Sequence, residues 1–337
     1  MKILVTGHAG FIGAAVARRL LDDGHQVVGI DNYNDYYDVR LKRARAARLQ
    51  GPGFVEVVAD LADRARVEAL YAETAPEAVV HLAAQAGVRY SVSHPHAYLS
   101  ANLTGFLHVL EGCRAHAVRH LVYASTSSVY GANPRLPYSE EQSTEHPLSL
   151  YAASKKANEL MAHSYAHLYG LPCTGLRFFT VYGPWGRPDM ALFKFARAIL
   201  AGEPIELYNH GAHARSFTYI DDVVEGIVRL LDQPARPSAE REPLDPGQSP
   251  VAPYRIYNIG NETSVPLLRY VELLEQALGR RAERRLLPAQ QGDVPETAAR
   301  TARLHAAVGY APRVSVEEGV ARFVEWLQSN PWVLEKP

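Results

Sequence analysis

Short apolar runs alternate with longer amphipathic stretches through the first half of the chain. Turn residues bound the continuous runs, which is typical of strands buried on both faces. The stretches between them repeat apolar positions at helical spacing. Such alternation predicts a parallel sheet with helices on both faces, a doubly wound α/β fold. The expected strands are KILVTG (2–7), QVVGI (26–30), FVEVVAD (54–60), AVVHLAA (78–84), HLVYAS (120–125) and CTGLRFF (173–179).

The pattern loosens past about residue 176, which predicts a second, smaller α/β lobe. Residues 234–253 are rich in proline and poor in apolar side chains, so this segment predicts a mobile surface loop. We expect the sheet domain to span 1–176 with returning segments at about 217–260, and the second lobe to combine 177–216 with 261–337. Within this half the expected elements are helices near 190–201, 264–278 and 316–328, and a strand followed by a helix over 205–232.

Composition narrows the class of function. Lys and Arg number 35 and Asp and Glu 36 in 337 residues, so charge favours neither nucleic acid nor an anionic membrane as partner. Cys113 and Cys173 lie in apolar patterns and are expected to be reduced core thiols. No apolar run approaches a membrane span of ~20 residues, and the first expected strand leaves no room for a signal peptide, so a cytoplasmic location is predicted. Four histidines lack further ligands at suitable spacing, and we expect no metal: His94, His96, His210 and His213.

The stretch VTGHAGFIG follows the first expected strand and opens a helix. Glycines spaced in this way form a tight turn whose backbone and helix N-terminus approach a pyrophosphate. Asp31 ends the second expected strand, where a carboxylate accepts from a ribose diol and repels a 2′-phosphate, so NAD is favoured over NADP. His8 is expected to point outward, with a pyrophosphate contact as the alternative. The residues of the turn assigned to the cofactor are Gly7, Gly10, Phe11, Ile12 and Gly13.

The next two strands end at the same edge of the sheet, where ligands of open α/β sheets bind. Asp60 is placed to reach the adenine, and small residues after the fourth strand leave space for a dinucleotide. The residues of these strand ends assigned to the cofactor are Asp60, Leu61, Leu82, Ala83 and Ala84.

SLYAASKKANELMAHSYAHLYG predicts one long helix that stops at Gly170. Tyr151 and Lys155 are one helical turn apart and share a face. An ammonium near a phenol lowers the phenol's pKa, so Tyr151 is the candidate general base and acid. Thr126, at the end of the preceding strand, is placed to share the substrate's hydroxyl proton. We expect catalysis by Thr126, Tyr151 and Lys155, with the last two also binding the cofactor.

At this point the chain resembles the extended short-chain dehydrogenase/reductase family, over essentially its whole length. The resemblance implies that NAD binds the N-terminal domain, that a nucleoside-diphosphate sugar binds the smaller lobe, and that the protein is a homodimer. Within the sugar-nucleotide branch, five segments are similar to the UDP-glucuronate 4-epimerases: DNYNDYYDVRLKRARAARL (31–49), HLAAQAGVRYS (81–91), RFFTVYGPWGRPDMA (177–191), RSFTYIDD (215–222) and GDVPET (292–297).

The end of the fifth strand carries hydroxyls and no acid. In this branch tyrosine removes the O4 proton as C4 is oxidised by NAD, and a dehydratase or decarboxylase would need acids where Ser127 and Ser128 stand. The 4-keto form of a glucuronate is a β-keto acid, so an epimerase must hold its carboxylate while the ring turns over. Ser127, Ser128 and Thr180 are candidate neutral donors to that carboxylate; ordinary turn or strand-end hydroxyls are the alternative.

Arginines supply the charged partners that the resemblance implies. Arg187, in GRPDM, is expected to bind the substrate's acid or its diphosphate, and Arg215 the UDP diphosphate. The resemblance carries Asn102 to the cofactor, and Asn32, next to Asp31, is also assigned to it. Arg89 touches substrate or phosphate, or else forms a surface salt bridge. Three departures from the family put the fine contacts to uridine and phosphate in doubt: Trp185 with Gly186, Ser216, and Arg300.

The reaction expected is therefore the interconversion of UDP-glucuronate and UDP-galacturonate. UDP-glucose/UDP-galactose 4-epimerase is the alternative, because it uses the same machinery on a neutral sugar. A non-catalytic NAD-binding sensor or scaffold is a remote third, since such a protein is expected to lose Tyr151 or Lys155.

Overall fold

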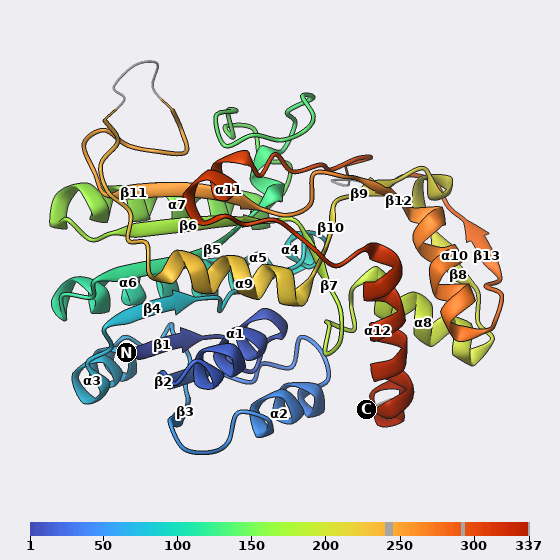
Figure 1. Ribbon diagram of the computed structural model, residues 1–337, viewed down its shortest axis with the longest axis horizontal. Coiled ribbons are helices and arrows are strands. Elements are labelled where there is room, and N and C mark those ends of the chain that lie inside the picture. Colours follow the sequence, from blue (N-terminus) through green and yellow to red (C-terminus); the bar gives the residue numbers. More distant parts are fainter. Residues whose placement is uncertain (240–244, 291–293, 336–337) are drawn as a thin grey trace.

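The computed structural model describes residues 1–239, 245–290 and 294–335. Its centre is a seven-stranded parallel sheet in the order β3-β2-β1-β4-β5-β6-β11, which confirms the doubly wound fold (Figure 1). The strand order reverses direction between β1 and β4, and such a switch point is where open α/β sheets bind ligands. The strands are β1 (Lys2–Thr6), β2 (Gln26–Asp31), β3 (Phe54–Val58), β4 (Ala78–His81), β5 (His120–Thr126), β6 (Cys173–Phe178) and β11 (Tyr254–Ile259).

Two strands differ from the prediction. The run YRIYNI was not recognised as a strand, yet β11 pairs with β6 from Tyr254 opposite Cys173 to Ile259 opposite Phe178. The apolar run of β11 is short and follows a polar segment, so the sequence pattern did not indicate a strand there. In addition, β3 is not buried on both faces: as the edge strand it leaves Val55 and Val58 more than half exposed.

Helices cover both faces of the sheet, and successive side chains of one strand serve opposite cores. Ile3 and Val5 of β1 pack in one hydrophobic cluster, and Leu4 packs in the other. On the first face lie α1 (Phe11–Asp22), α9 (Ile220–Leu231) and α11 (Ala302–Val308), and on the second α3 (Arg64–Thr74), α6 (Gly105–Ala115) and α7 (Leu150–Tyr169).

None of the helices within the described residues has the length and apolar character that crossing a membrane requires.

The second lobe packs beyond the carboxyl ends of the strands, at the right of Figure 1. Each predicted helix is present within three residues of its expected bounds. Ser315 caps the last helix, since its side chain accepts a hydrogen bond from the Glu318 N–H. The lobe contains α8 (Ala191–Ala201), α10 (Leu267–Leu278), α12 (Val316–Ser329), β8 (Ile205–Leu207) and β13 (Arg284–Leu286).

Three further segments border the cleft between the two parts. The first is α2 (Val39–Ala47), which follows β2. The others are two-stranded: β7 (Thr180–Tyr182) pairs with β10 (Phe217–Tyr219), and β9 (Ala214–Arg215) pairs with β12 (Val265–Pro266). These pairs place Thr180 and Arg215 beside the ends of the central strands.

The segment predicted to be a mobile loop, 234–253, has ordered flanks. The Ser238 N–H donates to the Ser249 carbonyl over 2.7 Å, and Arg303 bonds the Asp245 carboxylate just after the gap. Residues 240–244 lie outside the described residues, so the mobility of the loop stays a prediction. Gly292 and Asp293 of the segment GDVPET also lie outside them.

Candidate active site

One cavity of about 930 Å³ runs along the carboxyl ends of the central strands and into the second lobe. Every residue that we assigned to the cofactor, the chemistry or the substrate lines it, apart from Asn102. Its walls come from both the sheet domain and the second lobe. The cavity thus runs from the glycine turn, where we predicted the cofactor, to α8 and β7 in the part where we predicted the sugar. We call these the cofactor end and the sugar end.

The glycine turn accepts only glycine at its closest points. A Cβ on Gly13 would lie 2.0 Å from the Gly7 carbonyl oxygen, and one on Gly7 would lie 2.9 Å from the Ala83 nitrogen. Gly10 caps α1 with no side-chain hydrogen bond, so the first N–H groups of the helix are not taken by a cap. This arrangement fits a pyrophosphate at a helix N-terminus.

We expected His8 to point outward or, as the alternative, to contact the pyrophosphate. It does neither, because its side chain points toward β3. Its side chain is fully buried, and its Nε2 lies 3.0 Å from Glu56 Oε1 on β3. Gly29 on β2 makes the room, because a Cβ there would lie 2.6 Å from the His8 ring. His8 therefore anchors the turn to the sheet from below.

Asp31, Asn32 and Asp60 lie together at the ends of β2 and β3. The Tyr33 N–H donates to Asp31 Oδ1 over 2.8 Å, and Asn32 Nδ2 donates to Asp60 Oδ2 over 2.8 Å. Lys42 Nζ is 4.0 Å from Asp31. Two carboxylates at this edge suit the hydroxyls of an adenosine ribose.

Asn102 lies behind the cavity wall, so the structure does not support the direct cofactor contact that we predicted. Its amide bonds both the N–H and the carbonyl of Gln85, over 2.8 and 3.0 Å, and donates to Ser154 on α7. Asn102 instead ties the segment after β4 to the helix that carries Tyr151.

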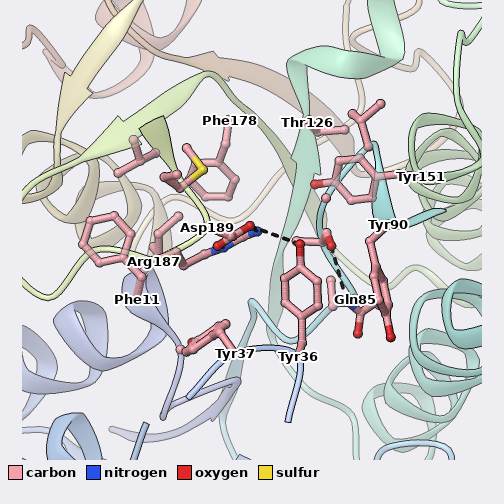
Figure 2. Close-up of a pocket in the computed structure, with 18 of the residues that line it drawn as sticks. Phe11, Tyr36, Tyr37, Gln85, Tyr90, Thr126, Tyr151, Phe178, Arg187 and Asp189 are labelled. Atoms are coloured by element: carbon pink, nitrogen blue, oxygen red, sulfur yellow. Dashed lines mark hydrogen bonds and ion pairs between the residues drawn. The ribbon is translucent and has the colours of Figure 1, made fainter. Parts of the chain in front are cut away.

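Tyr151 and Thr126 face each other at the centre of the cavity (Figure 2). Ser149 caps α7 by accepting from the Ala152 N–H, which fixes the first turn and with it Tyr151. Burial raises the pKa of Tyr151, and a hydrogen bond with Thr126 and the charge of Arg187 offset only part of that rise. Burial therefore dominates, and Arg187 is the cation that lowers this pKa. The lowering that we predicted from Lys155 stays a prediction.

Lys155 is buried, and its Nζ has no hydrogen-bond partner among the described residues. Burial lowers the pKa of Lys155 to about 8, against a smaller raising effect of Glu159. A buried ammonium is stable only with acceptors nearby. Its position beside the cavity fits the hydroxyls of a cofactor ribose.

The hydroxyls after β5 are grouped as the sequence indicated. Thr126 Oγ1 accepts from the Ser128 N–H and donates to Ser128 Oγ, each over 3.2 Å. Ser127, Ser128 and Thr180 line the same cavity as Tyr151. Their placement brings neutral donors to the sugar end without an acid at positions 127 and 128.

Arg187 reaches the cavity already paired. Its Nε and Nη2 donate to the two carboxylate oxygens of Asp189 over 3.0 and 2.5 Å, and Tyr36 donates to the same carboxylate over 3.1 Å (Figure 2). Burial alone would raise the pKa of Asp189, but Arg187 holds it below its usual range. The guanidinium that we predicted to bind the substrate's acid or its diphosphate is therefore one half of a nearly neutral pair.

The other two arginines border the far part of the cavity. Arg215 Nη1 donates to the Ala214 and Pro295 carbonyls over 3.0 and 2.9 Å. Arg89 lies over the Tyr208 ring at 4.9 Å, and so spans from the sheet domain to the second lobe.

Of the three departures from the family, the structure explains the residue type of Ser216. At Trp185 and Arg300 it shows backbone bonds, which leave the residue types unexplained. Ser216 is fully buried and bonds both the carbonyl and the N–H of Asn261, so it faces away from the ligand space. The Trp185 carbonyl accepts from Arg45. Arg300 is exposed and uses its backbone to pair with Tyr138.

Sequence reasoning missed Tyr36 and Asp189 as cavity residues. Two signals were present: an acid two residues after Arg187, and a repeated tyrosine shortly after Asp31. Neither signal shows that the two segments meet, because 153 residues separate them.

Comparisons with known proteins agree with this geometry. The model of a family described as the NAD dependent epimerase/dehydratase family matches residues 3–260. A probable UDP-glucuronate 4-epimerase of Rhizobium meliloti is 54% identical over 335 residues, covering 98% of each chain.

Solved structures are similar over nearly the whole chain. The UDP-glucuronic acid 4-epimerase of Bacillus cereus, in complex with UDP-glucuronic acid and NAD, has a TM-score of 0.85 and 30% identity, covering 98% of this chain and 99% of that one. The UDP-glucose 4-epimerase of Thermotoga maritima, with UDP-glucose, also has a TM-score of 0.85, with 29% identity, covering 98% and 100%.

Proposed function

The chain belongs to the NAD dependent epimerase/dehydratase family, and we propose that it is a UDP-glucuronate 4-epimerase that interconverts UDP-glucuronate and UDP-galacturonate. One observation carries the choice of substrate: the strand that ends at Thr126 continues into two serines and no acid, and these serines line the same cavity as Tyr151 and the Arg187 pair. The similarity to a probable UDP-glucuronate 4-epimerase, which covers 98% of this chain, supports this choice of substrate.

The cofactor end suits NAD. The glycine turn would hold the pyrophosphate, and Asp31 with Asn32 and Asp60 the adenosine. Lys155, whose ammonium lacks a partner within the described chain, would donate to the nicotinamide ribose. NAD, when bound, supplies the acceptor and then the donor of the hydrogen at C4.

Tyr151 is the proposed proton carrier for O4. Its phenol would take the O4 proton as C4 is oxidised and return it after the ring has turned over, with Thr126 holding the same oxygen. The Arg187 charge lowers the pKa of Tyr151 from the sugar side. Because burial raises this pKa, the phenol needs cationic neighbours before it can act as a base near neutral pH.

The neutral hydroxyls protect the carboxylate. A 4-keto glucuronate loses carbon dioxide readily when its carboxylate stands orthogonal to the ketone plane. Ser127, Ser128 and Thr180 would hold the carboxylate by hydrogen bonds while the ring rotates. Arg187 would approach the acid as part of a pair, which limits how tightly it grips, and Arg215 would serve the diphosphate.

We also infer a cytoplasmic location and a homodimer. Cys113 and Cys173 are free buried thiols, which suits a reducing compartment. Leu160 and Leu168 on α7 are more than 60% exposed, and exposed apolar side chains on one helix suit an interface. Light scattering coupled to gel filtration tests the dimer directly.

The decisive experiment uses purified protein without added NAD. The protein is incubated separately with UDP-glucuronate and UDP-glucose, and the sugar H4 signals are followed by NMR. We expect UDP-galacturonate to form from the first and no change in the second. Conversion of UDP-glucose alone would reassign the protein to the neutral-sugar epimerases.

A further inference from the structure

Among the described residues, two arginines are completely buried, and they are bound in different ways. Arg177 pairs with the Glu159 carboxylate through two bonds of 2.9 Å. Arg45, on α2, bonds no carboxylate anywhere in the described residues. Burial lowers the pKa of Arg45, but a guanidinium stays protonated near neutral pH. A buried cation without an acid is costly, so its position calls for an explanation.

The partners of Arg45 come from two segments that lead directly into residues lining the cavity, the glycine turn and the loop before Arg187. Nη1 donates to the Ala9 carbonyl, within the glycine turn, over 3.2 Å. Nε and Nη2 donate to the Trp185 carbonyl over 2.9 and 2.6 Å, and Nη2 also donates to the Gly186 carbonyl over 3.0 Å. The remaining bond, from Nη1 to the Tyr37 hydroxyl, is 2.6 Å long. One planar group thus fastens the cofactor turn to the loop that carries Arg187.

The conformation of that loop must be stabilised by contacts with residues outside it. The Gly186 N–H donates to the Gly183 carbonyl over 3.1 Å, so residues 183–186 form a tight turn. Trp185 occupies its third position with a φ of 63°, where glycine or asparagine is usual. A tryptophan in that conformation costs energy that its surroundings must offset. Arg45 donates hydrogen bonds to the carbonyls of both Trp185 and Gly186, and Arg187 is the next residue.

We propose that Arg45 is a positioning residue for both ends of the cavity, and that it links retention of NAD to recognition of the substrate's carboxylate. Fixing the glycine turn fixes the Arg45 fork, and the fork fixes Trp185 and Gly186, which set the direction of Arg187. By thermodynamic reciprocity, a ligand acid held at Arg187 then tightens the hold on the cofactor. The inference rests on the proposed function, because it requires a sugar acid at Arg187.

The first test uses the wild-type holoenzyme. Release of bound, isotope-labelled NAD into excess unlabelled NAD is timed alone, with UDP-glucuronate and with UDP-glucose. Both nucleotide sugars cover the cavity, so their difference reports the carboxylate. We expect UDP-glucuronate to slow the release about tenfold more than UDP-glucose, a typical coupling between sites. Equal slowing by the two overturns the link.

The second test replaces the guanidinium of Arg45. Arg45→Lys keeps the charge but cannot reach carbonyls on two loops at once. With NAD in excess, we expect its KM for UDP-glucuronate to rise about tenfold with kcat changed by less than about threefold. Its Kd for UDP-glucose, measured by direct titration, should stay near wild type. Its NAD release should respond equally to the two sugars.

The matched control is Arg48→Met. Arg48 lies over the Trp185 ring at 4.7 Å but bonds neither carbonyl, so the control should keep the wild-type difference between the sugars. An Arg45→Lys protein that keeps that difference overturns the proposal. If it does not fold, the wild-type release measurement still decides.

Turnover of UDP-glucuronate by the same wild-type preparation separates two kinds of failure. Turnover with equal slowing refutes only the role of Arg45. No turnover refutes the proposed function together with this extension of it.

Discussion

The cofactor end and the sugar end of the cavity are built from different kinds of groups. The cofactor end is mainly backbone: a glycine turn, a helix N-terminus and strand ends, where an added Cβ on Gly13 would lie 2.0 Å from a carbonyl oxygen. The sugar end is side chains that bind one another, as Arg187, Asp189 and Tyr36 do. The first end tolerates almost no change in shape, whereas the second is tuned by charge and hydrogen bonding.

The sharpest way to divide the two ends is Tyr151→Phe. Loss of the phenol oxygen removes the proton carrier, so turnover should fall about 10³-fold, while NAD stays bound because the glycine turn is untouched. NMR rates and the NAD released on denaturation measure the two effects. Tyr165→Phe on the same helix is the control, since its hydroxyl bonds Glu111 instead. A Tyr151→Phe protein of near wild-type rate would remove Tyr151 from the mechanism.

Gly13→Ala should do the reverse. The new methyl group must push the helix start from the turn at a cost of about 3 kcal/mol, equivalent to about 100-fold in NAD affinity. The purified protein should contain little NAD and recover activity when NAD is added in excess. Gly24→Ala, at the other end of α1, is the comparison, because open space surrounds Gly24. Gly24 has a φ of 81°, which alanine adopts at a cost, so Gly24→Ala should lower the free energy of unfolding by about 1 kcal/mol without loss of NAD. Full NAD retention in Gly13→Ala would contradict the assignment of the turn.

This contrast also explains what could be predicted from sequence. The glycine turn and Asp31 follow from residue types at fixed points of a strand–turn–helix unit, and Tyr151 and Lys155 from one helix. The geometry of Arg187 does not, because its direction depends on Asp189 and on Tyr36, which lies 153 residues from Asp189. His8 was misplaced for a similar reason. The room for its ring is made by Gly29 on another strand, and a glycine within a strand was the available sign of a close approach.

Charge at the sugar end is tested by Arg187→Met alone and with Asp189→Asn. The single change leaves the Asp189 carboxylate facing the substrate's carboxylate without its cation. We expect the KM for UDP-glucuronate to rise about 30-fold, near 2 kcal/mol, with a much smaller change in the Kd of UDP-glucose. The double variant should regain part of the loss, because it removes the repelling charge. A double variant no better than the single one would show that Asp189 does not act on the substrate.

The smallest expected effect belongs to the hydroxyls after β5. Changing Ser127 and Ser128 together to alanine removes two donors to a charged group, and should raise the KM for UDP-glucuronate about tenfold. The Kd of UDP-glucose should rise less, since this sugar offers no carboxylate. Ser125→Ala is the matched control: its hydroxyl donates to Glu159 over 2.7 Å, so its loss should affect both sugars alike. Any UDP-pentose among the products of the double variant would come from loss of carbon dioxide, and would show that these hydroxyls also restrain the 4-keto acid. Equal weakening of UDP-glucuronate and UDP-glucose would instead mean that Ser127 and Ser128 only complete the turn, and that Thr180 and Arg187 bind the acid.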